Sequence, residues 1–135
     1  MITGLDHLVL TIADLEATLR FYCEGLGMRH ETFGAGRSAL HFADHKINLH
    51  VAGRELEPKA LRPRPGSADL CFLTERPLAE VVDRLATIGH PAFLGPVERT
   101  GAIGPLVSIY ARDPDGNLIE IARRARAAQH IVADR

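Results

Sequence analysis

The feature that most constrains the fold is an internal repeat. LDHLVLTI at Leu5–Ile12 can be aligned with SADLCFLT at Ser67–Thr74, and this alignment places His7 on Asp69, 62 positions further on. A chain of 135 residues is short enough for one domain. The repeat therefore predicts two halves of one plan within a single domain, rather than two separate domains.

The first half has the pattern of a strand, a helix and three more strands. Leu5–Ile12 is rich in Leu, Val, Ile and Thr, which is typical of a buried strand. Asp14 then stands where a helix N-cap belongs, and apolar residues recur at spacings of three and four until Gly27. Three short strand patterns follow at Met28–Phe33, Arg37–Ala43 and Lys46–Val51.

The second half repeats this order and completes the predicted fold. Its helical pattern ends at Gly89, 62 positions after Gly27, and GNLIE at its end aligns with DHKIN, which places Asn48 on Glu120. A strand–helix–strand–strand–strand unit cannot bury its sheet face alone. We therefore predict an α+β fold in which two βαβββ modules in tandem form a curved mixed sheet around a pocket.

The predicted boundaries follow the composition. One domain covers residues 1–123, with module 1 at about 4–52 and module 2 at about 67–123. A polar, proline-bearing linker joins them at 53–66, and a charged, alanine-rich tail occupies 124–135.

Composition and charge limit the kinds of binding partner and the cellular compartment that we expect for this protein. The formal net charge is −1, which gives no bulk attraction to nucleic acid or to an anionic membrane surface. The start of the chain lacks a basic signal-peptide region, and no apolar run reaches 18 residues. We expect a cytoplasmic protein with no nucleic-acid or membrane partner. Its two cysteines, Cys23 and Cys71, are expected to be reduced thiols.

Three polar residues interrupt apolar strands at related places in the two halves: His7, Asp69 and Glu120. Buried carboxylates need a partner, and one bound cation satisfies two of them together. An imidazole and two carboxylates suit a divalent metal ion such as iron, manganese, nickel, zinc or magnesium. Taken singly, each residue also has an ordinary structural explanation, namely a core histidine, a turn-forming aspartate or a salt-bridged glutamate.

Two longer motifs resemble the signature regions of the vicinal oxygen chelate superfamily, which contains glyoxalases, bleomycin resistance proteins and dioxygenases. The first is LDHLVLTIADLEATLRFYCEGLGM, and the second is RDPDGNLIEI. The resemblance extends from Leu5 to Ile121. More narrowly, AGRELEPKALRPRPGSADLCFLTE and GPVERTG resemble the glyoxalase domain-containing protein 5 branch.

The resemblance implies metal ligands on the first, fourth, fifth and eighth strands. These positions correspond to His7, Asp69, Glu120 and one undecided residue, Asn48 or His50. Asn48 stands where glyoxalases carry glutamate, and Asp69 stands where many relatives have histidine. His50 lies two residues beyond Asn48 on the same strand face, so it is either the ligand or an acid/base residue in the pocket.

The implied function is a metal-dependent, glyoxalase-like lyase or isomerase, with a dioxygenase ranked second, that acts on a small oxygen-bearing substrate chelated to the metal. Glu120 would carry the proton, and arginines such as Arg37, Arg99 or Arg112 would bind an acidic group of the substrate. The resemblance also implies a homodimer. The alternative is a non-catalytic protein that binds drugs or other small molecules in a pocket.

Overall fold

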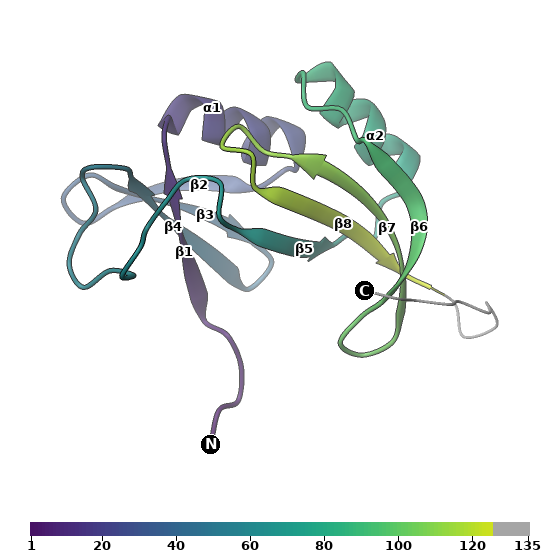
Figure 1. Ribbon diagram of the computed structural model, residues 1–135, viewed down its shortest axis with the longest axis horizontal. Helices are drawn as coiled ribbons and strands as arrows, with labels where there is room; N and C mark the ends of the chain where they lie inside the picture. Colours follow the sequence, from purple (N-terminus) through teal and green to yellow (C-terminus); the bar gives the residue numbers. More distant parts are fainter. Residues whose placement is uncertain (126–135) are drawn as a thin grey trace.

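The computed structural model describes residues 1–125, which form two modules with the same order of elements (Figure 1). Module 1 contains β1 (His7–Ile12), α1 (Leu15–Leu19), a π-helical continuation η1 (Arg20–Gly25), β2 (Arg29–Phe33), β3 (Arg37–Phe42) and β4 (His45–Val51). Module 2 contains β5 (Asp69–Leu73), α2 (Leu78–Thr87), β6 (Leu94–Thr100), β7 (Pro105–Arg112) and β8 (Leu118–Arg124). The predicted pair of βαβββ modules is confirmed. Because β8 runs to Arg124, the first residue of the predicted tail belongs to a strand, and residues 126–135 lie outside the described part.

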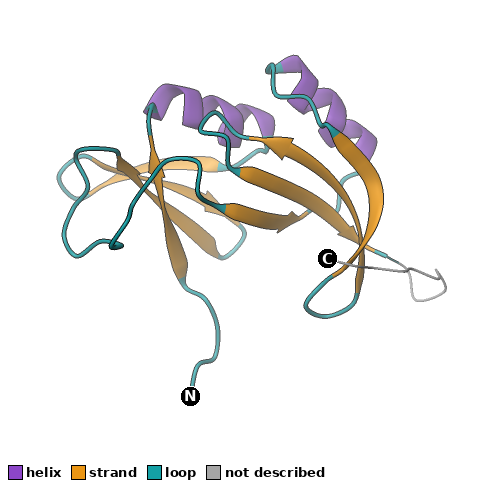
Figure 2. Ribbon diagram, viewed as in Figure 1, coloured by secondary structure: helices purple, strands orange, loops and turns teal. Residues whose placement is uncertain are grey.

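Each module forms a four-stranded sheet, with strand orders β1-β4-β3-β2 and β5-β8-β7-β6. The first and last strands of each module pair in parallel, and the other pairs are antiparallel, so both sheets are mixed as predicted. Strands β1 and β5 each pair on one side only, so the expected curved sheet consists of two hydrogen-bonded halves. Both helices lie on the same side of these sheets (Figure 2). We call the helix-covered side of each sheet its inner face and the opposite side its outer face.

Strand register shows that the repeat is structural. Val9 faces Asn48 across β1 and β4, and Cys71 faces Glu120 across β5 and β8. These are the residues that the two sequence alignments equate. The predicted equivalence of the modules therefore holds for individual strand pairs. It includes the predicted match of His7, the first residue of β1, with Asp69, the first residue of β5.

Both helical segments end in the same way. Gly27 and Gly89 have positive φ angles of 76° and 83°, a region that glycine enters without steric cost. The following residue in each module donates its backbone N–H to a carbonyl of the last helical turn: Met28 to Tyr22, six positions back, and His90 to Leu85, five positions back. These bonds satisfy carbonyl groups that the helix leaves unpaired, which explains why both patterns stop at glycine.

Replacing Gly89 with Ala is expected to lower the free energy of unfolding by about 1–2 kcal/mol, because a Cβ disfavours the left-handed conformation. A Cβ at this position meets no atom within 4 Å, so the cost is conformational and not steric. Urea denaturation measures it, with Gly4→Ala as the control, since Gly4 is equally open and has no positive φ. Equal midpoints for the two variants would contradict this account of the helix end.

One apolar core lies between the helices and the inner faces and spans both modules. It includes the buried side chains of Leu10, Ile12, Phe21, Tyr22, Leu40, Ile47, Leu85, Ile109, Ile119 and Ile121. Burying them removes a continuous apolar surface from water, which is the main stabilising contribution in a domain of this size. The two modules are therefore joined by a shared core.

A turn at residues 113–117, which we call the seam turn, ties the two modules together with polar contacts. Asp113 is buried, and its Oδ2 accepts hydrogen bonds from the Tyr22 hydroxyl at 2.7 Å and from Asn117 Nδ2 at 2.8 Å. Its Oδ1 accepts from the backbone N–H groups of Asp115 and Asn117. Burial and the Asp113 charge raise the pKa of Tyr22 above its usual range, so this hydroxyl stays protonated and donates.

In the part of the chain that the structure describes, no helix is long and apolar enough to cross a membrane. Within the described residues, Cys23 and Cys71 are not joined to each other by a disulfide.

Candidate metal and substrate site

The predicted site residues all lie on the outer faces of the two sheets. Side chains alternate along a strand, and the partners of a register pair share a face. The outer face of module 1 therefore carries His7, Asn48 and His50, while that of module 2 carries Asp69 and Glu120.

In module 1, the register distinguishes the two candidates for the undecided position. Asn48 faces Val9, two residues beyond His7, so the side chains of His7 and Asn48 are diagonal neighbours. Diagonal neighbours in a sheet lie within reach of long side chains. His50 lies two residues further along β4, beside Thr11, and so is one step further from His7.

The His7 imidazole is held by its chain neighbour. Its Nδ1 donates to Oδ1 of Asp6 at 2.8 Å, and this bond lowers the pKa of the Asp6 carboxyl. Histidines that bind metals usually donate one ring nitrogen to a carboxylate in this way, which orients the other nitrogen toward the ion. The side chain of His7 is 42% exposed, so Nε2 is accessible to a further ligand.

Asn48 carries an unsatisfied polar atom. The residue is 6% exposed, and its Oδ1 is buried without a hydrogen-bond partner. Leaving a buried acceptor unpaired costs about 1–3 kcal/mol. Such an atom on the outer face, diagonal to His7, fits a site where a bound group supplies the missing contact.

In module 2, Glu120 is fully buried at 1% exposure, and its Oε2 accepts a hydrogen bond from Ser108 at 2.7 Å. Asp69 is the exposed first residue of β5, and its position relative to Glu120 is the same diagonal that relates His7 to Asn48. Sequence reasoning missed Ser108. Its signal was a polar residue within an otherwise apolar strand pattern, LVSIYA in β7.

The predicted ligands form one pair on each module. Among residues 1–125, no three His, Cys, Asp or Glu side chains are placed to hold a metal ion together. His7, Asp69 and Glu120 therefore do not form one three-ligand cluster within the described part of the chain. Each module offers two of the predicted ligands, and the assignment of all of them to one metal stays a prediction.

A cavity of about 700 Å³ opens at the end of the module 1 sheet, between the start of α1, the β2–β3 turn and the beginning of the linker. His50 lines it, is 7% exposed, and makes no hydrogen bond or ion pair with any other described residue. Arg37 and Arg54 also line the cavity, together with Asp14 and Glu16. Arg37 was a candidate for binding an acidic group, whereas Arg54, at the edge of the predicted linker, was missed.

The other two arginines considered from sequence contact aromatic rings elsewhere. The Arg99 Nε donates to the Tyr110 hydroxyl at 2.9 Å, and the Arg112 guanidinium lies 5.4 Å from the centre of the Phe93 ring. Neither lines the cavity that contains His50.

Comparison with known proteins agrees with this fold and these motifs. The family model of the glyoxalase/bleomycin resistance protein/dioxygenase superfamily matches residues 4–121. The chain belongs to this superfamily, whose members bind small molecules and commonly use divalent metal ions.

Two relatives show how far the likeness extends. Virulence protein STM3117 from Salmonella typhimurium is 55% identical over 123 residues, which is 91% of this chain and 85% of that protein. Its crystal structure matches with a TM-score of 0.88 at 54% identity, covering 93% of this chain and 99% of that one. Glyoxalase domain-containing protein RDO1 from Mycosarcoma maydis is 52% identical over 121 residues, covering 90% of this chain and 68% of that protein.

More distant structures share the fold alone. A lactoylglutathione lyase from Agrobacterium tumefaciens has a TM-score of 0.67 at 18% identity and covers 91% of this chain and 95% of that one. TnmS3, an antibiotic-binding protein from Streptomyces sp. CB03234, has a TM-score of 0.72 at 21% identity and covers 92% and 98%. The fold thus serves both an enzyme and a binding protein, so the function must be argued from the site.

Proposed function

We propose that this protein is a divalent-metal-dependent, glyoxalase-like lyase or isomerase that acts as a homodimer on a small oxygen-bearing substrate. The metal would be held by His7 and Asn48 of one subunit together with Asp69 and Glu120 of the other. The observation that carries the proposal is the equal register of these two pairs, of which one contains a buried amide oxygen without a partner. A two-fold dimer would place each pair against its counterpart and give two equivalent sites.

The donor set fits a hard or borderline divalent ion. One imidazole nitrogen and three oxygens suit iron, manganese, nickel, zinc or magnesium, and four protein ligands leave positions for substrate oxygens. The Asp6–His7 hydrogen bond supports this interpretation, because it fixes the histidine with one nitrogen directed away from its carboxylate partner. The choice of Asn48 rather than His50 follows from its diagonal position beside His7.

A bound metal ion would stabilise negative charge on two adjacent substrate oxygens. Glu120 is the residue to carry a proton between neighbouring carbons, because its carboxylate is buried and oriented by Ser108. His50 lines the neighbouring cavity and would lie beside the substrate without binding the metal. These residues favour proton-transfer chemistry, so the dioxygenase remains second.

The first test is metal content, measured by elemental analysis of protein purified without chelator. We expect close to one divalent ion per chain, lost in His7→Ala and Glu120→Gln and retained in the matched controls His45→Ala and Glu31→Gln. Asp6→Asn should weaken metal binding by about 10–100-fold, because it removes the carboxylate that orients His7. Protein that is folded by circular dichroism yet refuses every added ion would refute the proposal.

Mixed dimers test whether the site is shared between subunits. His7→Ala and Glu120→Gln chains are unfolded together and refolded, so that half of the dimers contain one chain of each. In such a dimer one site carries both substitutions and the other carries none, so about a quarter of all sites should regain metal. No regain in a sample shown to contain mixed dimers would place the ligands elsewhere.

The alternative is a binding protein without catalysis, and the cavity beside His50 favours it over other non-enzymatic functions. It would be distinguished by small-molecule binding that persists when no metal is present and when Glu120 is replaced by glutamine.

A further inference from the structure

We propose that the cavity at the end of the module 1 sheet is an oxyanion subsite formed by Arg37, Arg54 and His50. If the subsite belongs to the proposed metal-dependent enzyme, the substrate has two chelating oxygens at one end and a carboxylate or phosphate at the other. This assignment of the substrate rests on the proposed function. The subsite itself is independent of any metal.

The distance between Asn48, a proposed metal ligand, and the cavity sets the expected separation of the two ends of the substrate. His50 is two residues beyond Asn48 on β4, a separation of about 7 Å along a strand. Continuing the register of β3 and β4 past Ser38 and Leu49 brings Arg37 beside His50. The two ends of the substrate would therefore be separated by a few bonds.

The Arg37 side chain is held in place by an aromatic ring, and its guanidinium can still donate hydrogen bonds to an anion. Its guanidinium lies 4.7 Å from the centre of the Phe33 ring, and Lys46 Nζ lies at 4.7 Å from the same ring. This contact restrains the side chain without using its hydrogen-bond donors. Arg37 forms no ion pair with a described carboxylate, so its planar fork is available to bind two oxygens of one anion.

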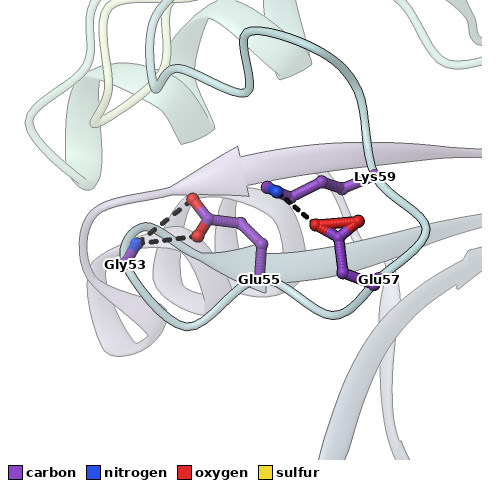
Figure 3. Close-up of polar contacts among 4 residues, drawn as sticks. All are labelled: Gly53, Glu55, Glu57 and Lys59. Atoms are coloured by element: carbon purple, nitrogen blue, oxygen red, sulfur yellow. Dashed lines mark hydrogen bonds and ion pairs between the residues drawn. The ribbon is translucent and has the colours of Figure 1, made fainter.

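The acidic residues around Arg54 already have partners of their own. Both carboxylate oxygens of Glu55 accept from the backbone N–H of Gly53 at 3.1 Å, and Glu57 pairs with Lys59 (Figure 3). These bonds leave Arg54 without a carboxylate partner among the described residues, on the wall of the cavity.

The burial of the polar side chain of His50 in the cavity wall supports a ligand-binding site there. The residue lines the cavity, is 7% exposed and makes no hydrogen bond or ion pair with another described residue, although it interacts electrostatically with Glu55. The acidic groups that face this region are Asp14, Glu16 and the more distant Glu55, whose pKa is lowered partly by His50. Asp14 is occupied, because its Oδ1 accepts from the Glu16 backbone at the start of α1. On the side formed by β3 and β4 the cavity is lined by Arg37 and His50, whereas its acidic residues, Asp14 and Glu16, lie on the side of α1.

The test uses metal-free protein and inorganic phosphate, with acetate in parallel. Binding is followed by the NMR signal of the His50 Cε1 proton, identified by its absence in His50→Gln. We expect saturable shifts, and Arg37→Gln and Arg54→Gln should each weaken phosphate binding at least tenfold. Arg29→Gln removes a charge from the same outer face but outside the cavity, so it should change affinity less than twofold. Preference for phosphate or acetate identifies the anion.

A second measurement separates this inference from the proposed function. With metal-loaded protein, 2-hydroxyglutarate should bind at least tenfold more tightly than 2-hydroxybutyrate, which has the same chelating end but no second carboxylate. Arg37→Gln should abolish the difference. Phosphate binding in a protein that takes up no metal would leave the subsite standing and refute the proposed function. Absence of phosphate and acetate binding, or binding unaffected by Arg37→Gln and Arg54→Gln, would refute the subsite.

Discussion

Replacing Asp113 with Ala is expected to lower the free energy of unfolding by about 3–4 kcal/mol. The buried carboxylate accepts four hydrogen bonds, two from side chains and two from backbone N–H groups. Its removal leaves these donors without their acceptor, and each unpaired buried group has its own cost. One of them, the Tyr22 hydroxyl, belongs to module 1, so the loss also weakens the contact between modules.

Urea denaturation followed by circular dichroism measures this effect. Asp44→Ala is the control, since Asp44 is exposed in a turn and its removal should change stability by less than about 0.5 kcal/mol. Tyr22→Phe removes one of the four bonds and should fall between the two. If Asp113→Ala were no more harmful than Asp44→Ala, the seam turn would not be a stabilising contact.

Replacing Phe21 with Ala should be similarly severe, at about 3–5 kcal/mol. The ring is 1% exposed and packs edge-on against Tyr22 and, in module 2, against His90, with ring centres 4.8 and 5.3 Å apart. Truncation removes apolar contacts and leaves a cavity where the two modules meet.

Phe93 supplies a matched control for this substitution. It is the same residue type but is 55% exposed, and its recorded ring partner is the Arg112 guanidinium. Phe93→Ala should cost less than about 1 kcal/mol. Comparable losses in the two variants would contradict the position of Phe21 in a core common to both modules.

The fold could be predicted from sequence because the repeat and the periodicity agree. Alternation in Leu5–Ile12, the Asp14 cap and the Gly27 and Gly89 stops each gave the correct type of element, within one or two residues at most boundaries. What sequence did not reveal was the π-helical turn at Arg20–Gly25. A change from four-residue to five-residue hydrogen bonding leaves the apolar spacing nearly unaltered.

The site was only partly predictable. Strand alternation correctly put Asn48 and His50 on the same face of β4, and the proposal that His7, Asp69 and Glu120 share one metal stays a prediction. Sequence spacing carried no information on which side chains of the two modules come close to one another, because that depends on how the modules pack. The residues around the linker were missed for a similar reason, since a loop has no period from which to predict which side chains line a cavity.

The common register of the two modules also bears on how such a chain arises and diverges. Two halves with the same strand order are the expected product of duplication of one ancestral unit, followed by local changes such as the register shift between Leu94 and Val97 in β6. Each copy was then free to alter its outer face independently. Here one copy carries an imidazole and an amide and the other carries two carboxylates at matching positions. The two modules thus keep the same strand arrangement while their outer faces carry different functional side chains.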